Sequence, residues 1–145
     1  KMESTEKQVA TGTNQEGFKA KAVDGLGSKR ITGRLYGHIS VKHAAELAGL
    51  GSITRNYLLT SARYGNLLWF SAVLTDAELS PDQPQRYDVC DACDKCVATC
   101  PAGALDNPAL FGQAECYRTC YKQVMGKLEL KCFRCRTVCA YRYGA

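Results

Sequence analysis

The sequence predicts a small α+β protein in which a helix and a β-hairpin pack on a mainly helical, cysteine-rich module. Three observations lead to this prediction. All nine cysteines of the 145 residues fall between positions 90 and 139, residues 40–47 have the composition of a short helix, and two apolar, β-prone segments lie between that helix and the cysteines. No stretch reaches the about twenty consecutive apolar residues of a transmembrane helix, so no membrane contact is expected.

Residues 1–33 are polar, rich in glycine, threonine, serine and lysine, and show no apolar periodicity. Terminal segments of this kind are commonly poorly ordered unless another element ties them down. We therefore expect residues 1–33 to be a flexible arm, or the remnant of a larger chain.

Residues 34–84 are expected to form a subdomain of one helix and one hairpin. Ser40 can cap a helix that runs to Leu47, and the glycines that follow can end it. The apolar segments 53–60 and 67–75 are separated by a turn-prone stretch, which is the pattern of a β-hairpin.

The predicted hairpin carries many apolar side chains. A free two-stranded hairpin is marginally stable in water, so these side chains need a surface to cover. Helices of the cysteine-rich module around Val97, Ala104 and Leu105 offer such a surface. We expect the hairpin and the module to form one unit, with Trp69 buried between them.

Residues 85–145 contain the motif that indicates a chemistry. Four cysteines spaced C-x2-C-x2-C-x3-C and followed by proline form the run with which bacterial ferredoxins hold iron–sulfur clusters. In proteins with two such clusters, the fourth cysteine of the run binds the other cluster. These residues are Cys90, Cys93, Cys96, Cys100 and Pro101.

A second, shorter run supplies the complement. Cys132, Cys135 and Cys139 read C-x2-C-x3-C, and the missing member can be Cys116 or Cys120. Two 4Fe–4S clusters need eight thiolates, so one of the nine cysteines is spare. The prediction is a bicluster, ferredoxin-like module for electron transfer. We expect short helices after Cys93 and over residues 114–124 and 132–139.

The cysteines allow two other uses. Zinc binds paired C-x2-C motifs, and a zinc-binding module that contacts nucleic acid or protein is the alternative function. The successive two-residue gaps and the Cys-Pro step favour iron–sulfur clusters over zinc. Disulfides fit least, because nine is an odd number and the repeats crowd the sulfurs.

The charge and composition bear on partners. The formal net charge is +5 with neutral thiols, and two oxidised clusters of about −2 each bring it to about +1. Basic and aromatic residues alternate at 131–136 and 141–143, a pattern that suits RNA but also offsets thiolate charge around a metal. The second interpretation is favoured, so a redox partner protein is expected. Reduced thiols and no visible export signal favour the cytoplasm.

Residues 37–141 resemble a known group of enzymes. The resemblance rests on the segments HAAELAGLGSI at 43–53, Asn56, Tyr64-Gly65 and AVLTD at 72–76, followed by the double cysteine run. This combination is similar to the C-terminal part of epoxyqueuosine reductases and to the iron–sulfur region of corrinoid-dependent reductive dehalogenases. In those families the module holds two 4Fe–4S clusters and feeds electrons to a cobalamin.

The resemblance also implies a ligand assignment. One cluster would bind Cys90, Cys93, Cys96 and Cys139. The other would bind Cys100, Cys116, Cys132 and Cys135, which leaves Cys120 as the spare cysteine. The half that binds cobalamin precedes the module in those enzymes, so cobalamin is possible but not supported by this chain alone. The chain could therefore be a fragment of a cobalamin-dependent reductase, and tRNA would be a partner if it is epoxyqueuosine reductase-like.

Few other residues suggest catalysis. Epoxyqueuosine reductases carry an acidic proton donor shortly before the lysine that corresponds to Lys42, and this chain has no acid there. A tyrosine donates the proton in reductive dehalogenases, so by resemblance Tyr36 is a weak candidate. The alternative for Tyr36 is an aromatic packing role. His38 and His43 flank a helix start, and surface or capping roles are expected for both.

Overall fold

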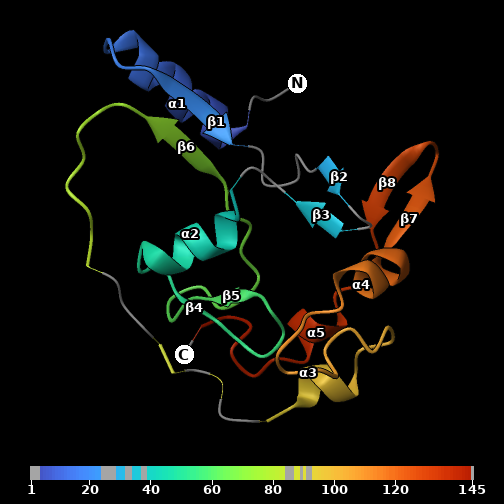
Figure 1. The fold of residues 1–145 in the computed structure, drawn as a ribbon. Coiled ribbons are helices and arrows are strands. Elements are labelled where there is room, and N and C mark those ends of the chain that lie inside the picture. Colours follow the sequence, from blue (N-terminus) through green and yellow to red (C-terminus); the bar gives the residue numbers. More distant parts are fainter. Residues whose placement is uncertain are drawn as a thin grey trace.

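A computed structural model describes residues 4–23, 29–31, 34–36, 39–83, 87–88, 90 and 93–144. Figure 1 shows helices and short strand pairs distributed along one chain. The helices are α1 (Thr5–Gln15), α2 (Val41–Leu47), α3 (Lys95–Ala98), α4 (Gln113–Cys120) and α5 (Arg134–Thr137). The strands are β1 (Ala20–Val23), β2 (Lys29–Ile31), β3 (Arg34–Tyr36), β4 (Ser52–Ile53), β5 (Leu59–Thr60), β6 (Ala72–Thr75), β7 (Tyr121–Val124) and β8 (Lys127–Leu130). Mixed helices and small sheets agree with the predicted α+β class.

Among the described residues, the strands pair into four separate two-stranded sheets, and each sheet is antiparallel. Such pairs are marginal by themselves, so packing between elements has to stabilise them. No helix in the described ranges is long and apolar enough to cross a membrane.

The N-terminal segment is not an unstructured arm. Helix α1 lies against β1, and β1 pairs with β6 in a register that sets Ala20 opposite Thr75. Asn14 joins helix and strand, because its Oδ1 accepts a hydrogen bond from Ala20 N at 2.9 Å and its Nδ2 donates to Ala20 O at 2.9 Å. The prediction of a flexible arm is therefore wrong for α1 and β1. The division into units at 1–33, 34–84 and 85–145 stays a prediction.

The predicted hairpin of residues 53–60 and 67–75 is also wrong. Strand β4 pairs with the nearby β5, while β6 pairs with β1. The segment between them turns back tightly through a bridge of Ser61 with Gly65 and then rests on the C-terminal segment. A Cβ on Gly65 would lie 2.2 Å from the backbone of Arg142, so glycine is required for this approach. The docking removes residues 67–71 from any ladder with β5.

Helix α2 forms as predicted and packs on the β4–β5 pair (Figure 1). Val41 and Ala45 face inward, and the Glu46 carboxylate accepts a hydrogen bond from Ile53 N at 2.7 Å. His43 is exposed at the helix start, with Nδ1 2.5 Å from Ser40 Oγ, which is the surface position expected for it. His38 lies outside the described residues.

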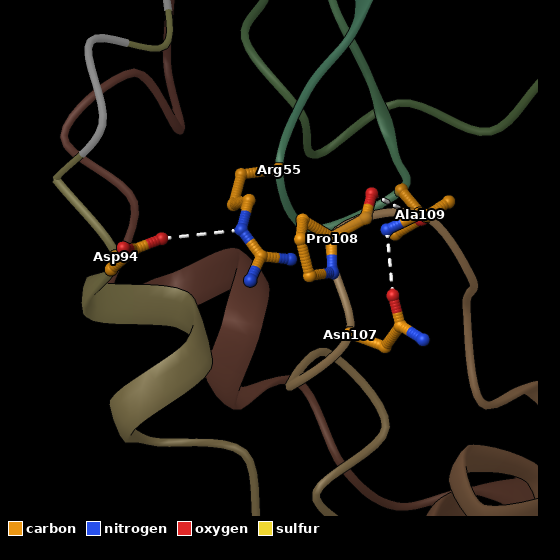
Figure 2. A network of polar contacts seen from close by, with 6 residues as sticks. Arg55, Asp94, Asn107, Pro108 and Ala109 are labelled. Atoms are coloured by element: carbon orange, nitrogen blue, oxygen red, sulfur yellow. Dashed lines mark hydrogen bonds and ion pairs between the residues drawn. The ribbon is translucent and has the colours of Figure 1, made fainter.

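Polar contacts join this region to the cysteine-rich module (Figure 2). Arg55 Nε lies 3.2 Å from the carboxylate of Asp94, which directly precedes α3. The Tyr57 hydroxyl donates to Pro108 O at 3.0 Å, and Asn107 Oδ1 braces that turn by accepting from the amide two residues later at 2.8 Å. The predicted single unit is thus supported by contacts, although they are polar.

Trp69 is not a core residue, which corrects the expected burial. Its side chain is 64% exposed, and the guanidinium of Arg136 lies over the ring at 5.2 Å from the centroid. Arg136 Nη1 donates to Asn66 O and, at 3.3 Å, to Leu68 O. Arg136, and not Trp69 as expected, therefore links the segment of Asn66 and Leu68 to α5. The core is smaller and includes Leu59, Ala104 and Leu105.

The module itself has the predicted short helices after Cys93 and within residues 132–139, and these helices, α3 and α5, contact each other. The helix predicted over 114–124 ends early. Helix α4 stops at Cys120, and the chain continues as β7 into the β7–β8 hairpin. Gly126, with a φ of +77°, makes the turn that the sequence pattern did not reveal.

Candidate metal centre

The first group of cysteines lines one pocket. Cys96 is buried there, whereas Cys90 and Cys93 are exposed. Cys139 lies on the same pocket, although it belongs to the second run. The other lining residues are Thr54, Asn56, Thr60, Lys95, Ala140 and Tyr141. Thiols from both cysteine runs therefore meet at one place.

Local backbone geometry brings these residues together. Asp94 has a φ of +43°, and this left-handed turn starts α3 between Cys93 and Cys96. Asn56 Nδ2 donates to Cys135 O at 3.3 Å, which attaches the β4–β5 loop to the start of α5. Because α3 contacts α5, Cys139 after α5 reaches the pocket of the first run.

The second group of cysteines is identified by the electrostatic effects of its thiols on one another's pKa values. Its members are Cys100, Cys116, Cys132 and Cys135. Burial raises the pKa of Cys116, the charges of Cys100 and Cys132 raise it further, and a hydrogen bond with Cys120 opposes the rise. Burial is the main cause that raises the pKa of Cys135, the charges of Cys116, Cys132 and Cys100 add to the rise, Arg136 opposes it, and the result is a pKa of about 11. The fourth cysteine of the first run therefore lies with cysteines of the second run.

The donor set fits metal clusters. Forming several thiolates side by side in a half-buried site costs free energy, because like charges repel and burial disfavours the charged form. A metal removes this cost because it binds each thiolate directly. Within the described residues, no three cysteine, histidine or acidic side chains are grouped tightly enough to hold a single ion. A 4Fe–4S cube requires no such tight grouping, since each of its four irons binds its own cysteine.

The ninth cysteine is close to the second group. Cys120 Sγ lies 3.4 Å from Cys116 Sγ, and the residue is 7% exposed. Burial, followed by the hydrogen bond and charge of Cys116, raises the pKa of Cys120. The spare cysteine of the sequence analysis is therefore a buried thiol in contact with a member of the second group.

The candidate catalytic residue Tyr36 ends strand β3, and β3 contacts helix α4 of the cysteine-rich module. Its side chain lies outside the described part of the structure, so its role as proton donor stays a prediction. The structure instead shows Lys42 held beside two aromatic rings. Its Nζ donates to Tyr57 O at 2.9 Å and lies 5.6 Å and 5.8 Å from the ring centroids of Tyr57 and Phe111.

The Lys42 site has no clear sequence signal. The two rings stack at 5.1 Å and come from distant segments, and Tyr57 has an unusual φ of +57°. Burial lowers the pKa of Lys42, and Glu46 partly opposes this. A lysine beside stacked aromatic rings gains a cation–π interaction that sequence periodicity cannot indicate.

Comparison with known proteins gives relatives of two kinds. The chain is 30% identical to the epoxyqueuosine reductase of Bacillus subtilis in an alignment of 118 positions that covers 74% of this chain and 30% of that protein. It is 35% identical to a tetrachloroethene reductive dehalogenase of Desulfitobacterium hafniense in an alignment of 109 positions that covers 71% of this chain and 19% of that protein. No protein-family model matches the sequence.

Solved structures agree. The structure of B. subtilis epoxyqueuosine reductase matches with a TM-score of 0.66 and 26% identity, covering 93% of this chain and 35% of that one. A complex of epoxyqueuosine reductase with a tRNA stem loop matches with a TM-score of 0.66 and 26% identity over 91% of this chain. The chain spans about a third of the length of these reductases. It is thus homologous to one part of epoxyqueuosine reductases and reductive dehalogenases.

Proposed function

We propose that the chain is a two-cluster electron-transfer module of a reductase. One 4Fe–4S cluster would be held by Cys90, Cys93, Cys96 and Cys139, and the other by Cys100, Cys116, Cys132 and Cys135. The observation that best supports the proposal is that Cys139 lines the pocket of Cys90, Cys93 and Cys96. In keeping with it, the charge of Cys100 adds to the raised pKa values of Cys116 and Cys135. This is the ligand crossing that two-cluster ferredoxins use.

The surroundings of the thiols support the proposal. Lys95 lines the first pocket, and Arg136 lies beside the second group, so each site has a cation near its thiolates. Positive charge and hydrogen bonds near the sulfurs tune the potential of a cluster. When bound, the clusters supply one-electron transfer. The protein residues hold them, shield them from water and balance their charge.

The homologues suggest where the electrons go. They are named epoxyqueuosine reductase and tetrachloroethene reductive dehalogenase, so the chain belongs to an oxidoreductase system. We propose a corrinoid site or a redox protein as the electron partner, and the cytoplasm as the place of action. The tRNA stem loop in one matched reductase complex makes tRNA the nucleic acid to test, should the chain act with such a reductase.

Metal analysis of the anaerobically purified chain tests the proposal. About eight irons and eight sulfides per chain are expected, with a visible absorbance that dithionite bleaches. Cys139→Ala and Cys100→Ala should each retain about four irons, because each variant removes a ligand of a different cluster. Thr137→Ala, an exposed change in the same helix as the second run, is the control and should retain all of them.

Two results would reject the proposal. Two zinc ions with no sulfide would establish the zinc-binding alternative, in which four thiolates hold each tetrahedral ion. Loss of all iron in both cysteine variants would contradict the assignment to two separate clusters. Adding cobalamin to the loaded chain and recording the corrin spectrum tests whether this segment contributes to a corrinoid site.

A further inference from the structure

Cys120, the cysteine outside both proposed groups of four, is the last residue of helix α4. Cys116 and Cys120 are four residues apart on this helix, so their side chains share one face. The Sγ atoms are 3.4 Å apart, well beyond the about 2.05 Å of a disulfide bond. Cys120 is also 7% exposed, which makes it a buried, unbonded thiol in contact with a proposed ligand.

A second constraint holds Cys120 near the other end of the same site. The β7–β8 hairpin starts immediately after Cys120, and its register sets Tyr121 opposite Leu130 (Figure 1). Beyond that pair, Lys131 N donates to Cys120 O at 2.6 Å. Because Lys131 precedes Cys132, the hairpin closes with Cys120 beside a second proposed ligand.

A space-filling role would require only a small apolar side chain at position 120. The helix and the hairpin instead direct a thiol at the thiols of the second group, and burial excludes competing solvent. A thiolate is the ligand that iron–sulfur clusters select. The position therefore offers one more sulfur than the cluster needs, within contact distance of the sulfur it would replace.

We propose that Cys120 is an interchangeable ligand for the cluster position of Cys116. This inference rests on the proposed two-cluster function. In the exchange, the bond from iron to Cys116 Sγ breaks while a bond to Cys120 Sγ forms. Cys120 gives up its thiol proton and Cys116 takes one, so no electron is lost or gained and the cluster keeps its charge.

Iron and sulfide analysis of four alanine variants of the full chain, loaded anaerobically, tests the exchange. The native chain, Cys116→Ala and Cys120→Ala should each hold about eight irons, because one sulfur remains for the position. The double variant Cys116→Ala/Cys120→Ala should hold about four. Cys100→Ala is the matched control, since it removes a ligand of the same cluster and should also hold about four.

Spectroscopy adds a readout that does not depend on the count. The reduced second cluster of Cys116→Ala should give a shifted electron paramagnetic resonance signal, because its ligand now comes from one helical turn later. Far-ultraviolet circular dichroism of each variant reports whether α4 persists, and Cys116→Ser repeats the count if Cys116→Ala fails to fold.

The outcomes separate the possibilities. A fall to about four irons in Cys116→Ala alone would overturn the exchange and leave Cys116 as the sole ligand. A fall in Cys120→Ala, with Cys116→Ala intact, would also overturn it by making Cys120 the sole ligand. A native chain without iron and sulfide would instead reject the two-cluster function, and the exchange with it.

Discussion

Replacing Arg136 should destabilise the protein more than replacing Trp69, although tryptophan is the larger residue. Arg136 Nη1 bonds two main-chain oxygens, those of Asn66 and Leu68, and its guanidinium covers the Trp69 ring. Arg136→Ala leaves both carbonyl groups without this donor. The chain segment before β6 then loses its main polar link to α5.

The magnitude follows from these contacts. A hydrogen bond to a charged group contributes about 1.5–3 kcal/mol, and the two bonds here share one nitrogen, so we expect a loss of about 2–4 kcal/mol. Truncating a fully buried tryptophan to alanine costs about 3–5 kcal/mol of stability. Trp69, however, is 64% exposed. About a third of that cost, roughly 1–1.5 kcal/mol, is expected for Trp69→Ala.

The assay is the rate of cluster loss in urea under anaerobic conditions, followed by visible absorbance. Cluster release makes unfolding irreversible, so a rate is the appropriate measure of stability. A change of 1.36 kcal/mol in the barrier changes a rate about tenfold. Arg136→Ala should therefore lose colour about thirty to a thousand times faster than the native chain at most, and Trp69→Ala about ten times faster.

Two variants control this experiment. Arg136→Lys keeps the charge next to Cys135 but offers a compact ammonium in place of the planar fork, so its rate should fall between native and alanine. Arg142→Ala removes an exposed arginine of the same segment, whose guanidinium donates to Thr137 O at 2.6 Å and lies 4.9 Å from the Tyr143 ring centroid. Because these contacts are exposed to solvent, the rate should change less than in Arg136→Ala. If Trp69→Ala loses its cluster as fast as Arg136→Ala, the argument for the arginine link fails.

Three further substitutions test the fold. Gly51→Ala should destabilise the protein, because its Cβ would lie 2.4 Å from Thr60 O. Gly12→Ala meets open space inside α1 and should stabilise the protein by about 0.8–1 kcal/mol. Thermal unfolding measures both variants, and shifts of the melting temperature in the same direction would contradict the prediction. Asn56→Ala should cost about 2–4 kcal/mol, because it leaves the half-buried Leu58 N–H and the Cys135 carbonyl without these partners. Amide exchange at Leu58 should then speed up, and an unchanged rate would refute the bracing role.

Local signals in the sequence predicted local structure. Ser40 and the alanine-rich segment after it indicated helix α2, and the cysteine spacing indicated short helices α3 and α5. The pairing of β1 with β6 could not be predicted, because it joins residues far apart in the chain and β1 has no distinctive pattern. The end of α4 was also missed, since no proline marks it and the turn depends on Gly126.

The same division holds for the site. The spacing of the runs predicts which cysteines would bind metal, and the proposed exchange of Cys100 and Cys139 follows the pattern of known two-cluster modules. Cys116 and Cys120 lie one turn apart in α4, as the helix predicted over 114–124 implies, whereas the Lys42 site depends on two rings that only tertiary packing brings together. Interactions that arise from tertiary packing alone leave no periodic trace.

The placement of Cys139 with the first run has a consequence for biosynthesis. Three cysteines of that group emerge from the ribosome early, but the pocket lacks its fourth thiol until residue 139 has been made. The second group waits in the same way for Cys132 and Cys135, which join Cys100. If the two proposed groups of four hold clusters, neither group can be completed during translation of the first run. A scaffold that delivers preformed clusters would then meet an acceptor only after both runs have been synthesised. Mutations that delay the closing of α5 onto α3 would expose the thiols to oxidation for longer.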